Sequence, residues 1–245
     1  MRAPGSTMAC VTVDMEQDCP PYFKTWRGVI EGTPVLLDLL AEEQVPATFF
    51  VTGELARRFP DTVYRILDAG HEVGAHGDTH ANFGRLSRGD ARFEIDRMTS
   101  TLGGMCRVTS FRAPYLTFPE AFVPLLDEYG YLVDSSAARY KFPGARVSRV
   151  GRVVRVPASV TSSTLRWPAW PRDWLLSHLS EPAVIFVHPW EFVDLTQARL
   201  RYDCRFKTGE PARRCLQESI RVLRRRGARF IRLAALSNTS QDRAQ

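Results

Sequence analysis

Two histidines in the segment 73–80 are spaced so that they could bind one metal ion. His76 and His80 are four residues apart, and on a helical turn residues at this spacing lie on the same face, about 5–6 Å apart at Cβ. Two neutral imidazoles at that separation can both reach one divalent cation. A pair of this kind alone is more often a pair of surface or hydrogen-bonded side chains, so a metal site needs a further ligand.

Carboxylates near the start of the chain could supply that ligand. Val11 and Val13 alternate with Thr12, Asp14 and Glu16, so the two carboxylates lie on the same face of a predicted strand. Acidic residues at a strand end are often ordinary turn residues. However, two histidines and one carboxylate, with one position open for water, form the ligand set of a catalytic zinc site.

Arg112 and Tyr115 follow a later predicted strand, in the segment 111–115. Pro114 has a fixed φ and pushes the residue before it toward extended backbone, so the chain after Arg112 is held rigidly. We expect Arg112 to point toward a carboxylate and the Tyr115 amide to be free to face a cleft. A structural salt bridge is the more common role of an arginine at a strand end.

His188 directly follows the apolar run 183–187 and precedes Pro189 and Trp190. A histidine in this position alone would more often be structural. Catalytic groups in α/β barrels come from the carboxyl ends of the strands, and this is the fourth such segment that ends a predicted strand with polar groups. We therefore count His188 as a candidate site residue.

The elements that must position these groups alternate between strand and helix patterns. Thr33 followed by Pro34 predicts an N-cap and the first position of a helix, and Ser87 with Asp90 predicts a capping box. Repeated β–α units imply parallel strands joined by right-handed crossovers. We predict an α/β fold, a distorted (β/α)7-8 barrel, as a single domain over residues 1–245 with a core at about 8–236. The predicted strands are 11–16, 46–51, 73–75, 108–112, 131–134, 153–156, 183–188 and 229–233, and the helices start at 33, 60, 87, 120 and 213.

Composition limits the classes of protein to which the chain can belong. Its 245 residues are 44% hydrophobic, enough for one substantial core. It has no run of 18 apolar residues and no apolar signal core in residues 1–8, so we expect a cytoplasmic protein without a membrane span. The net charge of +6 suits an anionic surface or polymer without requiring one. Five scattered cysteines without a C-x-x-C argue against a disulfide framework and favour reduced thiols.

Taken together, these motifs resemble the polysaccharide deacetylases, also called the NodB-homology domain or carbohydrate esterase family four. The first motif of that family supplies a base and a metal-binding carboxylate, which Asp14 and Glu16 resemble. The second is a histidine pair, as at residues 76 and 80. The third resembles residues 112–115, and the fifth, a hydrophobic residue two before a histidine, resembles Phe186 and His188. The motifs occur in the family's order and cover about residues 8–236.

The chain departs from the common family pattern at two motifs. The first motif is usually two adjacent aspartates, whereas here Asp14, Glu16 and Asp18 are spaced by two, which is similar to a subset with an Asp-x-Glu start and a His-Pro-Trp-Glu ending. Asp18 therefore stays an alternative metal ligand or base, although strand parity favours Glu16. The fourth motif keeps its first aspartate, Asp134, but lacks the later Asp-Trp pair, so Glu191 and Trp190 are candidates to replace that pair.

The resemblance implies a metal-dependent hydrolase that removes the N-acetyl group of an acetamido sugar in a polysaccharide, peptidoglycan or glycolipid. Glu16, His76 and His80 would hold a divalent metal, Zn²⁺ before Co²⁺, Mn²⁺ or Ni²⁺, which lowers the pKa of a bound water and polarises the acetyl carbonyl.

The resemblance also implies the acid–base roles. Asp14, held by Arg112, would remove the proton of the water, and the Tyr115 amide would stabilise the oxyanion. His188 would protonate the leaving amine. Trp190, Tyr22 and Tyr115 are candidates to stack on sugar rings, with Glu191 beside them.

Two alternatives stay open at this stage. One is a cyclic-amide or ureide hydrolase on the same scaffold. The other is a non-catalytic carbohydrate or nucleic-acid binder, supported by the arginine run 213–232. Such a run is usually a solvated helix face, so we expect no specific nucleic acid as a partner. The substrate and the oligomeric state are not determined by the sequence.

Overall fold

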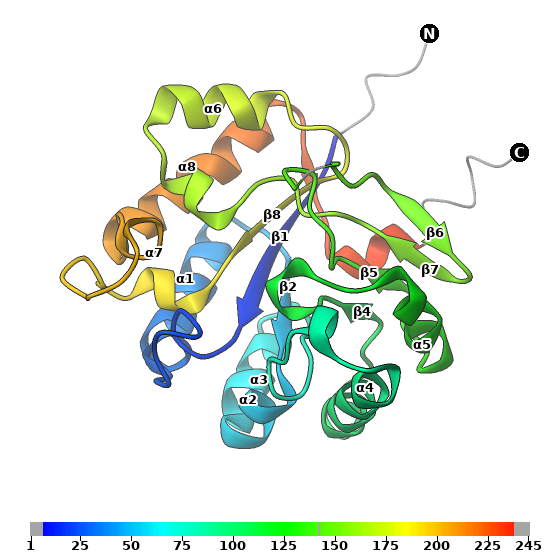
Figure 1. Ribbon diagram of the computed structural model, residues 1–245. Coiled ribbons are helices and arrows are strands. Elements are labelled where there is room, and N and C mark those ends of the chain that lie inside the picture. The colour runs from blue at the N-terminus through cyan, green and yellow to red at the C-terminus, as the bar shows by residue number, and fades with distance from the viewer. Residues whose placement is uncertain (1–6, 142, 238–245) are drawn as a thin grey trace, which may run out of the picture.

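The computed structural model describes residues 7–141 and 143–237, and its strands form one curled sheet (Figure 1). The strand order is β6-β7-β5-β4-β3-β2-β1-β8, and β9 pairs with the start of β1. All paired strands run parallel except the β6–β7 hairpin. The strands are β1 (Met8–Met15), β2 (Ala47–Val51), β3 (Glu72–Ala75), β4 (Ser110–Phe111), β5 (Val133–Asp134), β6 (Ser148–Val150), β7 (Val153–Arg155), β8 (Ala183–Val187) and β9 (Arg229–Phe230).

Hydrogen bonds after β7 bring the two ends of the sheet together. The Ser159 amide donates to the Val184 carbonyl over 2.7 Å, and the Val184 amide donates to Ser159 Oγ over 2.9 Å. The chain that follows β7 therefore joins β8, which itself pairs with β1. This is the distorted (β/α) barrel that the repeated β–α units predicted, and the chain forms one α/β domain.

Helices cover the outer face of this sheet, as Figure 1 shows. The alternation along β1 separates the two faces. Val11 and Val13 pack into the large core under the helices, whereas Cys10 belongs to a smaller cluster with Phe50 and Leu233. The helices are α1 (Thr33–Glu42), α2 (Gly53–Arg58), α3 (Pro60–Asp68), α4 (Arg88–Gly103), α5 (Val123–Glu128), α6 (Ala169–Ser177), α7 (Tyr202–Arg205) and α8 (Glu210–Arg225).

The predicted N-cap at Thr33 is wrong. A π-helical turn, Gly28–Gly32, runs directly into α1, so Thr33 is already helical and its hydroxyl contacts the Met15 sulfur. The two glycines explain this turn, because a Cβ on Gly28 would lie 2.4 Å from the Trp190 amide nitrogen and one on Gly32 would lie 2.0 Å from the Pro189 carbonyl oxygen. Only glycine allows the turn to approach the segment after His188 so closely.

Other expectations about elements are confirmed or shortened. The Ser87 hydroxyl accepts from the Asp90 amide at the start of α4, as a capping box requires. The strands predicted at 108–112 and 229–233 are only two residues long, and the second gives way to a 3-10 helix, Leu233–Ser237. Residues 1–6, on which the expectation about the N-terminus partly depended, lie outside the described residues. Among the described helices, none has the length and apolar character needed to cross a bilayer.

Candidate metal and active site

Two carboxylates, one at the end of β1 and one just after it, lie at the end of the barrel where the candidate histidines also lie. Asp14 and Glu16 are 4% and 6% exposed, and both line a pocket of about 260 Å³. Thr12, on the same face of β1, contacts the same arginine as Asp14. The period-two alternation of the strand therefore places these side chains on one face, as predicted.

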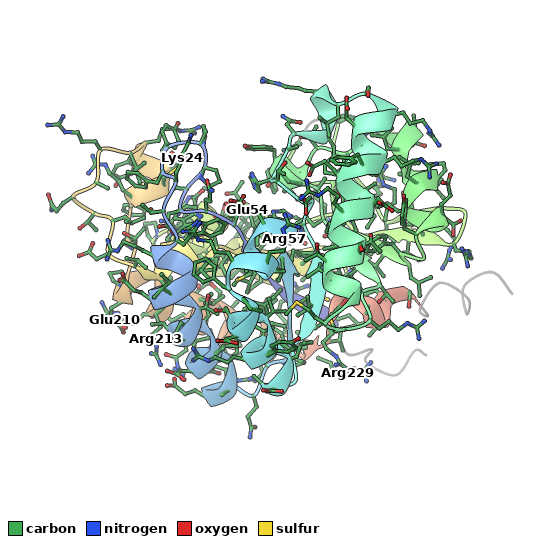
Figure 2. The ribbon with its side chains drawn as sticks, turned by 90° about the horizontal axis from the view of Figure 1, so that it is seen from below. Lys24, Glu54, Arg57, Glu210, Arg213 and Arg229 are labelled. Carbon is green, nitrogen blue, oxygen red and sulfur yellow. The ribbon has the colours of Figure 1, made fainter. Side chains whose placement is uncertain are left out.

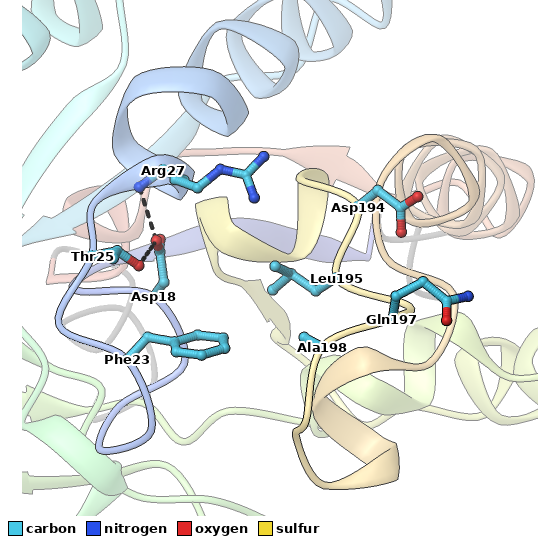
Figure 3. A pocket seen from close by; sticks show the side chains of 8 residues that line it. All are labelled: Asp18, Phe23, Thr25, Arg27, Asp194, Leu195, Gln197 and Ala198. Atoms are coloured by element: carbon cyan, nitrogen blue, oxygen red, sulfur yellow. Dashed lines mark hydrogen bonds between the residues drawn. The ribbon is translucent and has the colours of Figure 1, made fainter.

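Asp18 lies apart from this pocket. Its carboxylate accepts hydrogen bonds from the Thr25 hydroxyl at 2.6 Å and from the amides of Arg27 and Gly28 at 2.8 Å each. Figure 3 shows it beside Phe23 in a neighbouring cavity of about 380 Å³. Asp18 therefore holds the start of the π-helical turn, and the structure does not bring this alternative ligand or base to the histidines.

His76 and His80 meet, but not through a helical turn. The segment after β3 is irregular, and His80 has a left-handed φ of 62°. The two rings lie 5.3 Å apart between centroids. The expectation of a helical turn was therefore wrong, and a sharp backbone reversal produces the proximity instead. His76 Nδ1 lies 2.7 Å from the Arg112 carbonyl oxygen, which turns Nε2 toward the site.

A buried carboxylate fixes the loop that carries this pair. Glu94 of α4 accepts from the amides of Asp78 and Thr79 at 2.9 and 3.0 Å, and from the Thr79 hydroxyl at 2.7 Å. Asp78 is itself paired with Arg57 at 2.6 Å. These contacts constrain the backbone on both sides of the turn that His80 completes.

Glu16, His76 and His80 offer ligand atoms that all lie within 4.8 Å of one another. His80 Nε2 is 2.5 Å and His76 Nε2 is 3.7 Å from Glu16 Oε2. Burial raises the pKa of Glu16, but the nearby histidines, His80 and His188 first, outweigh it and hold this pKa well below its usual range. An ionised carboxylate and two imidazoles with their nitrogens turned inward fit a divalent metal ion.

Arg112 holds Asp14 on one side of this group. The arginine is 0% exposed, and its Nη1 donates to Asp14 Oδ1 and Thr12 Oγ1 at 2.7 Å each. Nη2 donates to Ser135 Oγ at 2.9 Å, and the Phe50 ring lies 4.4 Å from the guanidinium carbon. Asp14 is therefore held in one orientation by a buried cation that has several other partners.

His188 also lines this pocket, where it contacts Glu191. His188 Nδ1 is 2.7 Å from Glu191 Oε1, and Nε2 is 3.7 Å from Glu16 Oε1. Burial lowers the pKa of His188, but Glu16, Glu191 and Asp14 outweigh this and raise it to about 9. The Trp190 ring stacks on the imidazole, with centroids 4.9 Å apart and 19° between the planes. These contacts favour a protonated imidazole with a fixed ring.

Arg166 completes this side and was missed by the sequence analysis. It is 2% exposed, and its Nε lies 3.2 Å from Glu191 Oε2. Its other nitrogens donate to backbone carbonyls around α7, those of Phe206 at 2.5 Å and Asp203 at 2.8 Å. One signal could have drawn attention to it, because Arg166 is the single charged residue between Arg155 and Arg172.

The remaining predicted residues lie in three kinds of place: the pocket wall, the interior behind His188, and the exposed surface. Tyr115 and Trp190 line the pocket, together with Tyr140 and Lys141. Glu191 is only 1% exposed and touches His188, so it supports the histidine and cannot contact a substrate directly. Tyr22 is 48% exposed and lies outside the set of described residues that line this pocket.

The aspartate of the fourth motif also has a structural role. Asp134 accepts from Arg155 Nε at 2.8 Å and from the Ser136 amide at 2.9 Å, and it is 1% exposed. It is therefore bound within the barrel and separate from His188. The expectation that Glu191 and Trp190 take the place of the missing pair agrees with their contacts to the His188 ring.

Comparison with known proteins agrees with this arrangement. A family model described as polysaccharide deacetylase matches residues 12–133, which contain Asp14, Glu16, both histidines and Arg112. The chain belongs to the polysaccharide deacetylase family. The match ends before His188 and Glu191, so it does not cover this part of the pocket.

Individual relatives match the chain over shorter segments. A chitooligosaccharide deacetylase of Sinorhizobium fredii is 38% identical over 86 residues, 34% of this chain and 40% of the relative. A peptidoglycan-N-acetylglucosamine deacetylase of Bacillus cereus is 35% identical over 88 residues, 35% of this chain and 32% of the relative. The matched part thus spans well under half of the length of these curated relatives.

A solved structure from Mycobacterium smegmatis, described as a candidate polysaccharide deacetylase, covers nearly the whole fold. It superposes with a TM-score of 0.73, covering 99% of this chain and 93% of the other, at 20% sequence identity. At this identity the likeness concerns the fold alone. It agrees with a single (β/α) barrel built from this chain.

Proposed function

We propose that this chain is a metal-dependent deacetylase that hydrolyses the N-acetyl amide of an acetamido sugar in a polysaccharide, peptidoglycan or glycolipid. The observation that carries the proposal is one pocket that contains a Glu–His–His group, a buried aspartate held by Arg112 and a histidine in contact with Glu191. The names of the relatives, which act on chitooligosaccharide and on peptidoglycan N-acetylglucosamine, support the substrate class.

Glu16, His76 and His80 would hold the metal ion, with Zn²⁺ as the first candidate. A divalent metal there supplies a Lewis acid that polarises the acetyl carbonyl and lowers the pKa of a water. The Arg112 carbonyl, in contact with His76 Nδ1, supports this role because it leaves Nε2 free for the ion.

Asp14 would act as the general base. It lines the pocket, and its contact with Arg112 leaves the other carboxylate oxygen available to take a proton from water. The buried guanidinium holds the carboxylate in one orientation. Tyr115 follows the rigid turn at Pro114, with a left-handed φ of 61°, and its amide would donate to the oxyanion.

His188 would protonate the leaving amine. Its Nδ1 contacts Glu191, so Nε2 is the nitrogen that carries the proton into the pocket. Trp190 stacked on the ring and Arg166 behind Glu191 keep the imidazole in place. The aspartate and the histidine line the same pocket as the Glu–His–His group, and they would act as base and acid on an amide bond bound there.

Three arginines of the run that suggested a nucleic-acid binder pair with carboxylates of the protein. Arg213 of α8 pairs with Glu42 of α1, and Arg221 and Arg224 pair with Glu43. Figure 2 shows Arg213 next to Glu210 on the part of α8 that lies beside α1. These pairs support a structural role for the run, so we propose no nucleic-acid partner.

The test is acetate release by the purified protein from acetylated chitin oligomers, peptidoglycan fragments and acetylated glycolipids. We expect release from at least one class, loss of release on chelation, and recovery on addition of Zn²⁺. Asp194→Asn, a change at an exposed carboxylate in the neighbouring cavity, is the matched control and should leave release unchanged. Ring opening of a cyclic amide or ureide, with no release of acetate, would support the alternative hydrolase instead.

A further inference from the structure

Two cysteines from distant parts of the chain meet in the wall of the pocket. Cys19 lies in the loop after β1, and Cys204 lies in α7. Both line the pocket of Glu16 and the histidines, and both pack into a small cluster with Trp190. The proposed deacetylation uses neither thiol.

The two thiols differ in access and in reactivity. Cys19 is 3% exposed, whereas Cys204 is partly exposed. The neighbouring Cys19 thiol lowers the pKa of Cys204, with burial and Asp203 opposing this and Arg201 and Arg166 adding to it. The same contact, followed by burial, raises the pKa of Cys19. Cys204 is therefore the better nucleophile, because the thiolate is the reactive form.

We propose that Cys19 and Cys204 form a thiol modification site that reacts with a small-molecule disulfide and ends as an intramolecular disulfide. The geometry provides the two roles that such a site needs: a partly exposed sulfur on Cys204, and a nearly buried sulfur on Cys19, which packs into the same cluster at the wall of the same pocket. This site is independent of the proposed hydrolysis.

The chemistry takes two exchange steps. In the first, the Cys204 thiolate attacks one sulfur of the small disulfide, so that a mixed disulfide forms, the S–S bond of the reagent breaks and one thiol leaves. In the second, Cys19 gives its proton to solvent and attacks the Cys204 sulfur, which expels the second thiol. Two protein thiols are oxidised to one disulfide, and one small disulfide is reduced to two thiols.

The new bond would join two walls of the pocket. Pro20, next to Cys19, lines the pocket, while the carbonyl of Asp203, next to Cys204, accepts from Arg166. The disulfide would thus tie the loop after β1 to the segment that holds Arg166 behind Glu191. Burial raises the pKa of Cys10 and of Cys106, which makes these two thiols weaker nucleophiles.

The experiment exposes the purified protein to oxidised glutathione and maps its peptides by mass spectrometry without reduction. We expect a linked pair of peptides that contain Cys19 and Cys204. In Cys19→Ser the reaction should stop at a glutathione adduct on Cys204, and Cys204→Ser should leave Cys19 unmodified. Cys106→Ser, at a partly exposed thiol elsewhere, is the control and should still form the linked pair.

Two results would overturn the proposal. One is a wild-type protein in which both thiols stay free while Cys106 is modified. The other is a wild-type adduct on Cys204 that persists without pairing to Cys19. Because the wild-type peptide map alone distinguishes these results, the test does not depend on the folding of a serine variant.

Discussion

Two buried arginine–carboxylate pairs lie at the candidate site. The carboxylate of one pair lines the pocket, and the carboxylate of the other does not. Arg112 contacts Asp14, which lines the pocket, whereas Arg166 contacts Glu191, which is separated from the pocket by His188. Both arginines are at most 2% exposed. One pair therefore presents its carboxylate to the substrate side, and the other acts only through an imidazole.

An arginine–carboxylate contact can therefore support either a proposed base, as at Asp14, or a proposed acid, as at His188. A lone pair of electrons on Asp14 stays available because Arg112 occupies only one carboxylate oxygen. In the second pair, both oxygens of Glu191 are engaged, one by His188 and one by Arg166. The carboxylate then favours the protonated imidazole and cannot itself act on substrate.

Asp14→Asn should break the direct pair with the largest effect. The amide keeps the shape but cannot take up a proton, so we expect kcat to fall about 10²–10⁴-fold. Metal content, measured by elemental analysis, should stay largely unchanged. Asp18→Asn, on the same side of the chain but outside the pocket, is the control and should keep most of the turnover. A near-wild-type rate in Asp14→Asn would point to Glu16 as the base.

His188→Ala should remove the group through which the second pair acts. We expect kcat to fall by about 10²-fold or more, because the leaving amine loses its proton donor. The measurement compares acetate release from an acetamido sugar with release from an acetate ester of the same sugar. The rate of release from the ester should fall less, because an alcohol leaving group depends less on protonation than an amine does. Equal losses of rate for the two substrates would argue against an acid role of His188.

Arg166→Met should give a smaller loss that separates the two pairs. Glu191 keeps its contact with His188 but loses its cation, so the imidazole is held less firmly, and we expect kcat to fall about 10–100-fold with little change in KM. Arg172→Met is a matched control at another arginine that is 2% exposed, whose partners are Asp173 and Glu218. Equal losses of kcat in both variants would mean that Arg166 matters only for folding.

Glu43→Gln tests an arginine–carboxylate cluster far from the pocket. Burial raises the pKa of Glu43, but hydrogen bonds from Arg224, Arg221 and Gln217 outweigh it and lower the pKa below its ordinary 4.5. We expect the variant to lose about 1–2 kcal/mol of unfolding free energy at neutral pH and to keep its turnover.

The pH dependence of that loss follows from the direction of the shift. A carboxyl with a lowered pKa contributes stability above its ordinary pKa and loses this contribution as pH falls through its lower folded value. Chemical unfolding of both proteins should therefore give a difference that is largest at neutral pH and shrinks as pH falls below 4.5. A difference that does not change with pH would contradict the charged contact.

Much of the site could be predicted where it follows from strand geometry. The alternation along β1 placed Asp14 and Glu16 on one face, and His188 follows β8 directly. The proximity of His76 and His80 was also predicted, but from the wrong local structure, because a left-handed residue is not apparent from their spacing. Asp18 has the same strand parity as Asp14, yet the chain has already left β1 when it reaches this residue.

The support behind His188 could not be predicted from local pattern. Arg166 reaches Glu191 from a 3-10 helix, Ser162–Arg166, and is itself held by backbone carbonyls around α7. Such contacts depend on how segments that are far apart in the sequence pack together, and the hydrophobic periodicity of the sequence does not predict them. The same holds for the meeting of Cys19 and Cys204.

The metal content of the purified protein tests most directly whether Glu16, His76 and His80 bind one metal ion. Purified protein loaded with Zn²⁺ and then desalted should retain about one ion per chain. His76→Ala and His80→Ala should each lose most of that metal while the far-UV circular dichroism spectrum is kept, and His178→Ala, at an exposed histidine, should retain it. One metal ion per chain in both the His76 and the His80 variants would show that these histidines are not the metal ligands.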